Sequence, residues 1–314
     1  MGWIRRSLFG MDAAEATFAR RGFVAATPEA RTALESAGTA FLHGYNSALR
    51  SSEPGTLVRA LDELPDERRG FGVEGAGMEL QLIDLLTPWS AAHLRSFLEG
   101  PGINHPYMLH VGAGWALARL RRNLRPALER FDPLLRWLAV DGYGFHEGYF
   151  HGRRADAGRE RLASLGRAAC SIFDQGLGRS LWFARGAAVN QVAAAVAELD
   201  ESRRADVWSG LGLACTYAGG ASDAAIRELS LAAGPYLPHV AQGSCFAAGA
   251  RYRAGNEAPH TDRACRVLCG MPASHVAPIA ERARVGLAQD GRAETYLEWR
   301  AIVRSVLQSE QVAA

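Results

Sequence analysis

The sequence predicts an all-α fold, a single domain over residues 1–314 built from about seven helical hairpins of roughly 34 residues. Three observations predict it: a glycine motif that recurs along the chain, helix start and stop signals between its copies, and weak strand signals. The chain is long enough to bury a large core. We expect the hairpins to stack into an α/α superhelix or a closed α/α ring.

The recurring motif is a glycine followed two places later by a small residue and then by a large apolar one. It runs from HGYNSAL at 43–49 to QGSCFAA at 242–248, in steps of 31, 37, 30, 34, 34 and 33 residues. A step near 34 is the length of two helices and their turns, as in tetratricopeptide arrays. The seven lead glycines are Gly44, Gly75, Gly112, Gly142, Gly176, Gly210 and Gly243.

The segments between the motifs carry helix boundaries. Ser222 and Thr261 are expected to cap helix starts, while Gly219 and Gly255 are expected to end helices. The chain has no Asn-Gly hairpin sequence and few alternating β-branched runs, so strands are not expected. We therefore expect more than half of the residues to be helical.

Glycine inside a helix costs about 1 kcal/mol relative to alanine, so its repeated use indicates close approach of neighbouring helices. The glycine helices are expected to form the inner layer of the array. The residue before each lead glycine shares a helix face with the residue four places later. The first set is mostly polar: His43, Glu74, Val111, Asp141, Gln175, Ser209 and Gln242. The second is mostly large and apolar: Ser47, Met78, Trp115, Phe145, Arg179, Leu213 and Phe246.

These two rows have two interpretations. A mainly apolar surface with a few polar groups is typical of a ligand cavity. Alternatively, the polar row bonds neighbouring helices to one another. On the first interpretation, the substrate-binding candidates are Glu74, Trp115, Phe145, Tyr149, Gln175, Leu213, Gln242 and Phe246.

The densest group of reactive side chains is DGYGFHEGYFHGRR at 141–154. A carboxylate beside a histidine sets its tautomer and raises its basicity, which suits general acid–base catalysis. The catalytic candidates, expected to face one cavity from neighbouring glycine helices, are His110, Asp141, His146 and Arg179. A buried structural role is the alternative for His146. Arg179 could equally bind a ligand carbonyl or pair with Asp141 or Glu74.

No metal site is predicted. His146 and His151 are five residues apart, which places them about 140° apart around a helix instead of on one face. The five cysteines are expected to be small buried hydrophobes in a reducing cytoplasm. Cys265 and Cys269, with His260 upstream, lack the paired spacing and the fourth ligand of a zinc site.

Composition excludes several classes of protein. The chain contains no lysine, which excludes pyridoxal enzymes, Schiff-base aldolases, Walker-type phosphate loops and kinases. The arginine, alanine and glycine excess is typical of high-GC bacteria such as actinobacteria. The net charge of +2 is dispersed, which argues against a nucleic-acid partner. No apolar run reaches membrane-spanning length, and MGWIRRSLFG lacks the apolar core of a signal peptide, so a cytoplasmic location is expected.

Several segments together resemble the UnbL-type proteins of enediyne gene clusters, from ATFARRGF to about residue 270. They include RGFGVEGAGMELQLIDLLTPW, YMLHVGAGWALARL, DGYGFHEGYF, GLGRSLWF, VWSGLGLACTYAGG and PHTDRAC. The resemblance implies a context and no catalytic residue: such proteins accompany the polyketide synthase that makes a linear conjugated polyene.

The expected function is therefore that of an accessory protein of enediyne antibiotic biosynthesis that binds an apolar polyene or lipid-like molecule. Whether it also catalyses a step of core maturation stays open, and no cofactor is indicated. The alternative is a tetratricopeptide-like scaffold that docks partner proteins of the same pathway.

Overall fold

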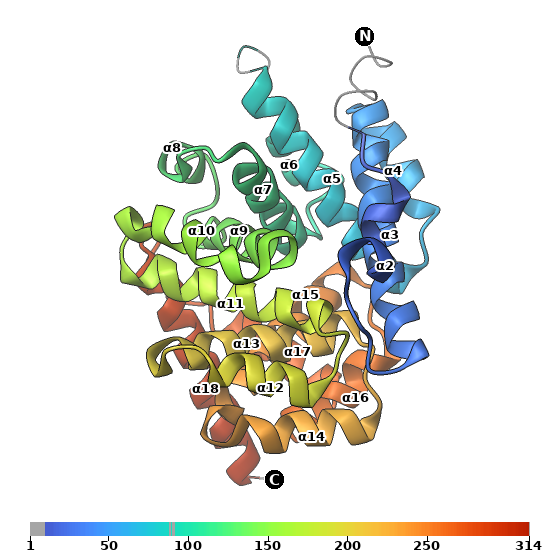
Figure 1. The fold of residues 1–314 in the computed structure, drawn as a ribbon. Coiled ribbons are helices and arrows are strands. Elements are labelled where there is room, and N and C mark those ends of the chain that lie inside the picture. Colours follow the sequence, from blue (N-terminus) through green and yellow to red (C-terminus); the bar gives the residue numbers. More distant parts are fainter. Residues whose placement is uncertain (1–9, 88, 90–91, 314) are drawn as a thin grey trace.

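The chain is all-α in a computed structural model that describes residues 10–87, 89 and 92–313. The structure is 78% helical, and no strand occurs in the described part of the chain, which confirms the predicted class (Figure 1). Residues 1–9, which make up most of the segment used to argue against a signal peptide, lie outside the described residues. No helix among the described residues is both long and apolar enough to cross a membrane.

Seven long helices carry the glycine motifs, and each packs against the next one along the chain (Figure 1). They are α3 (Pro28–Arg50), α5 (Asp66–Leu86), α7 (Pro106–Leu120), α9 (Trp137–His151), α11 (Arg167–Ala184), α13 (Glu201–Ala218) and α15 (Leu237–Ala254). We refer to them as the glycine helices.

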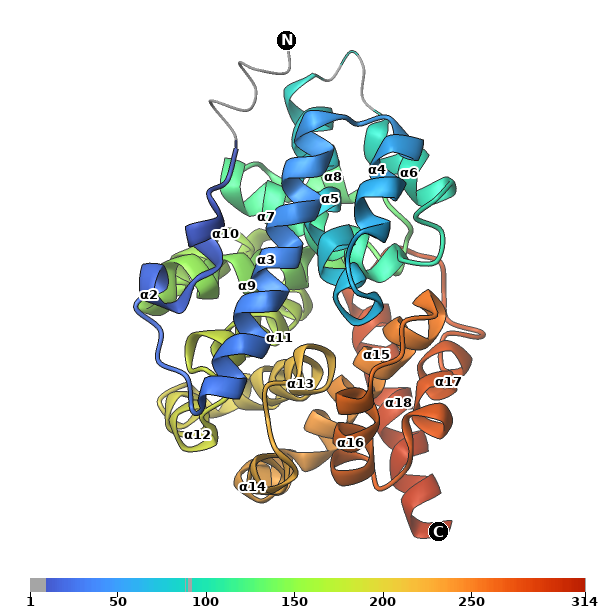
Figure 2. The same ribbon diagram turned by 90° about the vertical axis from the view of Figure 1, so that its right-hand side faces the viewer.

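A shorter helix follows each glycine helix. These helices are α4 (Pro54–Asp62), α6 (His93–Glu99), α8 (Leu124–Leu128), α10 (Asp156–Arg161), α12 (Val189–Ala197), α14 (Asp223–Ala233) and α16 (Pro259–Leu268). The chain begins with η1 (Ala13–Ala16) and α2 (Phe18–Arg21) and ends with α17 (Ala273–Arg282) and α18 (Ala293–Ala313). The first six shorter helices connect successive glycine helices, and the last, α16, leads from α15 to α17. Helices α12, α14 and α16 contact one another in turn, on the outside of α11 and α13 (Figure 2).

The glycines allow neighbouring helix backbones to touch. A methyl group placed on Gly210 would lie 1.9 Å from the Gln175 carbonyl oxygen, and one on Gly176 would lie 1.9 Å from that of Asp141. In five successive pairs of glycine helices, the lead glycine of one helix faces a backbone carbonyl oxygen of the helix before it. That oxygen belongs to the residue directly before the lead glycine of the earlier helix. These pairs are Gly112–Glu74, Gly142–Val111, Gly176–Asp141, Gly210–Gln175 and Gly243–Ser209. The expectation of close packing at Gly112, Gly142, Gly176 and Gly210 is therefore confirmed.

Most local boundary signals are confirmed. The Ser222 hydroxyl accepts a hydrogen bond from the Ala225 amide and caps α14, and Gly219 and Gly255 follow the last residues of α13 and α15. The prediction for Thr261 is wrong. Helix α16 already begins at Pro259, and the Thr261 hydroxyl instead donates to the Thr216 carbonyl oxygen at 3.0 Å. All five cysteines are buried and free, as expected.

Helix α5 also packs against helices far along the chain. Arg251 Nη2 on α15 donates to the Glu67 carbonyl oxygen of α5 at 3.1 Å. The rings of Phe71 on α5 and Tyr217 on α13 meet edge to face, with their centroids 5.1 Å apart. These contacts join α5 to α13 and α15, and apolar side chains of the three helices belong to one buried interior.

Candidate functional site

A buried cluster of one arginine and two carboxylates lies in this interior. Arg179 on α11 donates from Nη1 to Asp141 Oδ1 on α9, and its Nη2 lies 3.8 Å from Glu74 Oε1 on α5. The three residues are only 6%, 1% and 3% exposed, in that order. Of the two interpretations of Arg179, the structure shows the pairing with Asp141 and Glu74.

Burial sets the protonation of this cluster. Removal from water raises the pKa of Glu74 to about 7; Arg179 opposes the shift, and the negative charge of Asp141 adds to it. Burial lowers the pKa of Arg179, but the two carboxylates outweigh this and raise it, so the guanidinium stays charged. One cation thus faces two carboxyl groups, and the pKa of Glu74 lies near neutral pH.

The polar row forms a hydrogen-bonded network beside this cluster. Gln175 Nε2 donates to Asp141 Oδ2 at 2.7 Å and to the Tyr296 hydroxyl at 3.1 Å. The Ser209 hydroxyl donates to Gln242 Oε1 at 2.9 Å, and the same oxygen accepts from Arg300 Nε at 3.0 Å. Gln175 and Gln242 are fully buried in this network and line neither of the cavities described next. At these positions the polar row bonds neighbouring helices to one another.

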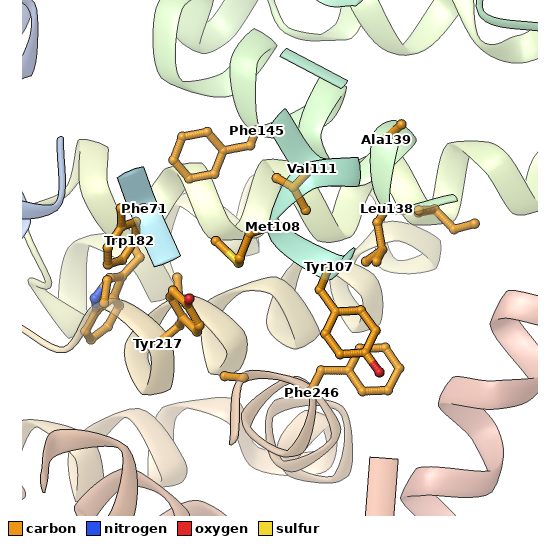
Figure 3. Packing of buried hydrophobic residues seen from close by; sticks show 14 of the residues in the cluster. Phe71, Tyr107, Met108, Val111, Leu138, Ala139, Phe145, Trp182, Tyr217 and Phe246 are labelled. Carbon is orange, nitrogen blue, oxygen red and sulfur yellow. The ribbon is translucent and has the colours of Figure 1, made fainter. Parts of the chain in front are cut away.

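Two apolar cavities flank Arg179, which lines both. The first has a volume of about 60 Å³ and is lined by Glu74, Trp115, Phe145 and Tyr149. The second has a volume of about 40 Å³ and is lined by Asp141, Leu213, Phe246, Tyr107, Met108 and Tyr217, among others. Figure 3 shows the last four of these side chains among the buried hydrophobic residues. A buried water molecule needs about 10–15 Å³ by this kind of measure, so each cavity has room for only a few small groups.

Stacked aromatic rings form the wall of the first cavity. The centroids of Trp115 and Phe145 lie 5.0 Å apart, and Phe145 stacks on Tyr149 at 5.7 Å. The Arg179 guanidinium carbon lies 5.0 Å from the centroid of the Phe145 ring, within the range of a cation–π interaction. The predicted apolar row therefore borders the charged cluster directly.

The sequence analysis missed several cavity-lining aromatics. Phe183 and Tyr217 each stand seven residues after a lead glycine, as Tyr149 does. A stripe along one helix face continues every four residues, so extending the two rows by one further step would have found them. Phe41 and Phe71, which precede the lead glycines Gly44 and Gly75, also line the first cavity and carried no such signal.

His110 lies away from the cluster. It is buried, and its Nδ1 donates to the Pro106 carbonyl oxygen at 2.6 Å. Burial lowers the pKa of His110, and its ring borders an open cleft of about 720 Å³ that Arg95, Arg130, Arg253 and Arg284 also line. His110 directly precedes Val111, the α7 counterpart of Asp141. One residue of offset turns a side chain by about 100°, which explains its different direction.

His146 also faces another region. Its ring packs against Trp115 and Phe150, with centroids 5.8 and 4.7 Å away, and burial lowers its pKa. It follows Asp141 by five residues and so points away from it on α9. Of the four catalytic candidates, the structure brings together Asp141 and Arg179, and it places His110 and His146 elsewhere.

The raised pKa of Glu74 predicts a pH-dependent stability. Between about pH 4.5 and 7 the folded chain holds a proton that the unfolded chain releases. The Glu74 contribution is therefore fully present below pH 4.5 and is lost as the pH rises through 7. In the wild type, this loss lowers the free energy of unfolding by roughly 3 kcal/mol as the pH rises over this range. We expect the decrease to be absent from Glu74→Gln, because glutamine does not titrate.

Urea unfolding of the wild type and the variant, at intervals from pH 4.5 to 8, measures this contribution. Only the difference between the two curves is interpreted, because buried histidines titrate in the same range with the opposite slope. A difference that stays constant with pH would contradict the assignment.

Comparison with known proteins gives a family and no activity. No curated protein matches the chain, and neither does a solved structure. The chain belongs to the DUF1702 family, described as proteins of unknown function, whose model matches residues 1–307.

Proposed function

We propose that this protein binds an elongated apolar small molecule, of the linear polyene class, in the interior on both sides of Arg179. One observation carries the proposal: large side chains of the glycine helices turn inward around two apolar cavities that share this arginine. An apolar lining with few polar groups is typical of small-molecule sites. The resemblance to UnbL-type proteins supports the polyene class and an accessory role in enediyne biosynthesis.

The ligand in this proposal needs more room than either cavity provides. We infer that binding moves the Arg179 side chain out of the passage between the two cavities, so that they form one channel along a curled array of glycine helices. Met11, Glu15 and Arg21 of the N-terminal segment line the first cavity, which makes that side the proposed entrance. A ligand can stabilise such an open state only by binding it more tightly than the closed one.

The burial of the aromatic row favours binding over the scaffold alternative. A docking surface would expose these side chains on a concave face. Trp115, Phe145 and Phe246 are instead buried. Among the described residues, the exposed large hydrophobic side chains are Val24, Leu86, Trp89, Ile103, Leu231, Tyr252 and Val285, and none of these belongs to the two rows.

Trans-parinaric acid, a fluorescent conjugated tetraene with a carboxylate, is a suitable probe. We expect saturable binding with energy transfer from tryptophan to the polyene. Leu213→Trp fills the second cavity and should weaken binding about tenfold or more, a loss of at least 1.4 kcal/mol. Leu231→Trp is the matched control, because Leu231 is 83% exposed and lies outside both cavities.

Circular dichroism establishes that both variants are folded before their affinities are compared. Equal affinity of the two leucine variants would place any bound probe outside the interior. If the wild type showed no saturable binding of the probe, the proposed function would be wrong.

A further inference from the structure

Three side chains with metal-binding atoms meet at the C-terminal end of α9. His146 Nδ1 lies 3.5 Å from Glu147 Oε1, and His151 Nε2 lies 3.9 Å from the same oxygen. One ligand atom from each of the three residues falls within 4.8 Å of the other two. The group is separate from Arg179 and its carboxylates, and it does not depend on the proposed function.

The structure corrects the expectation that His146 and His151 lie too far apart around the helix. Glu147 stands between them: it is adjacent to His146 and one turn before His151. His151 is the last residue of α9, and its ring centroid lies 5.9 Å from that of His146.

Two of the three side chains are held in place by their surroundings. His146 packs between Trp115 and Phe150. The Glu147 side chain fills the space left by Gly158, where a methyl group would lie 2.5 Å from Glu147 Cγ. Glu147 Oε1 faces the histidines, while Arg161 Nη1 lies 3.7 Å from Oε2. A carboxylate ligand is commonly oriented in this way by an outer partner on its second oxygen.

His146 has an unused nitrogen in this group. Its Nδ1 is buried and makes no hydrogen bond with the described residues, although Glu147 Oε1 is the nearby acceptor. Buried polar atoms without a partner are uncommon in folded proteins. The unpaired nitrogen thus points to a ligand at this position.

We propose that His146, Glu147 and His151 bind a divalent first-row transition-metal ion of the zinc class. Two imidazoles and one carboxylate form an established ligand set for such ions. Bonds of about 2.1 Å in a tetrahedral site hold ligand atoms about 3.4 Å apart. The separations here are larger, from 3.5 Å up to at most 4.8 Å, and rotation of the exposed His151 side chain would bring the three ligand atoms closer.

Three protein ligands would leave a fourth coordination position of a tetrahedral ion open. An open position distinguishes catalytic zinc sites from structural ones, which have four protein ligands. Trp115 and Phe150, against which His146 packs, also line the first apolar cavity. The proposed ion is therefore separated from that cavity by these two aromatic side chains.

Metal titration of the full-length protein, first stripped with a chelator, tests the site. Calorimetry with Zn²⁺ is expected to show one ion per chain, and Co²⁺ should give weak visible bands without intense thiolate absorption. That spectrum distinguishes the site from the five cysteines. His151→Asn and Glu147→Gln should each weaken binding about tenfold or more.

His275→Asn is the matched control, because His275 is also exposed and has no part in the group. It should bind Zn²⁺ as the wild type does. His151 is at the surface, so its replacement should leave the melting temperature of the metal-free protein unchanged and keep the test interpretable if Glu147→Gln unfolds. Absence of saturable Zn²⁺ binding by the wild type, or wild-type affinity in His151→Asn, would overturn the proposal.

Discussion

Gly210→Ala is expected to destabilise the fold by about 3 kcal/mol or more, although alanine is the better helix former. The added methyl would lie 1.9 Å from the Gln175 carbonyl oxygen and 2.7 Å from the Arg179 amide nitrogen. Both are backbone atoms, so no side-chain rotation relieves the clash. Helices α11 and α13 must move apart, and a chemical-denaturation curve should show a lower midpoint with a similar slope.

Gly55→Ala is the control for this prediction. Gly55 is also helical, but the atoms nearest to an added methyl belong to the flexible Glu53 carboxylate, the closest at 3.1 Å. Its replacement should be neutral or should stabilise the protein by up to about 1 kcal/mol. If Gly210→Ala were as stable as Gly55→Ala, close backbone packing would not be the reason for the glycine at position 210.

Arg179→Met is expected to cost about 3–5 kcal/mol, because it leaves Asp141 and Glu74 buried without their cation. The loss should be larger at pH 8 than at pH 5, since protonation of the carboxyl groups removes the uncompensated charge. Thermal or urea unfolding at the two pH values measures both effects.

Two further variants show whether charge causes this loss. Adding Asp141→Asn and Glu74→Gln to Arg179→Met removes the buried charges and should recover much of the stability. Arg263→Met removes an exposed pairing with Asp223 and should change stability by about 1 kcal/mol or less. A triple variant as unstable as Arg179→Met would show that the lost packing of the guanidinium against Phe145 dominates instead.

The contact between Asp141 and Arg179 follows from sequence spacing, whereas the positions of the histidines do not. Asp141 immediately precedes a lead glycine and Arg179 stands three places after the next one, so the shared packing of α9 and α11 brings them together. His110 and His146 are off this face by one residue position. The expectation that they would join it neglected the 100° that each residue adds around a helix.

The proposed metal-binding group shows a different limit of sequence reasoning. Ideal helical spacing separates His146 from His151, and the prediction compared only these two residues. Glu147 is adjacent to His146 and one turn before His151, so its carboxylate lies within 4 Å of both rings.

The sequence by itself determined the helical class, the spacing of the glycine helices and the positions that must remain small. These features depend on local helix propensity and on the spacing of residues a few places apart. Both can be read from a short stretch of the sequence. Only the tertiary structure decided how each helix is rotated, that α5 packs against α13 and α15, and how little space remains around Arg179. The pKa of Glu74 likewise depends on burial and on charges contributed by α9 and α11. Such properties arise where atoms from distant parts of the chain meet and exclude water, which no local pattern encodes.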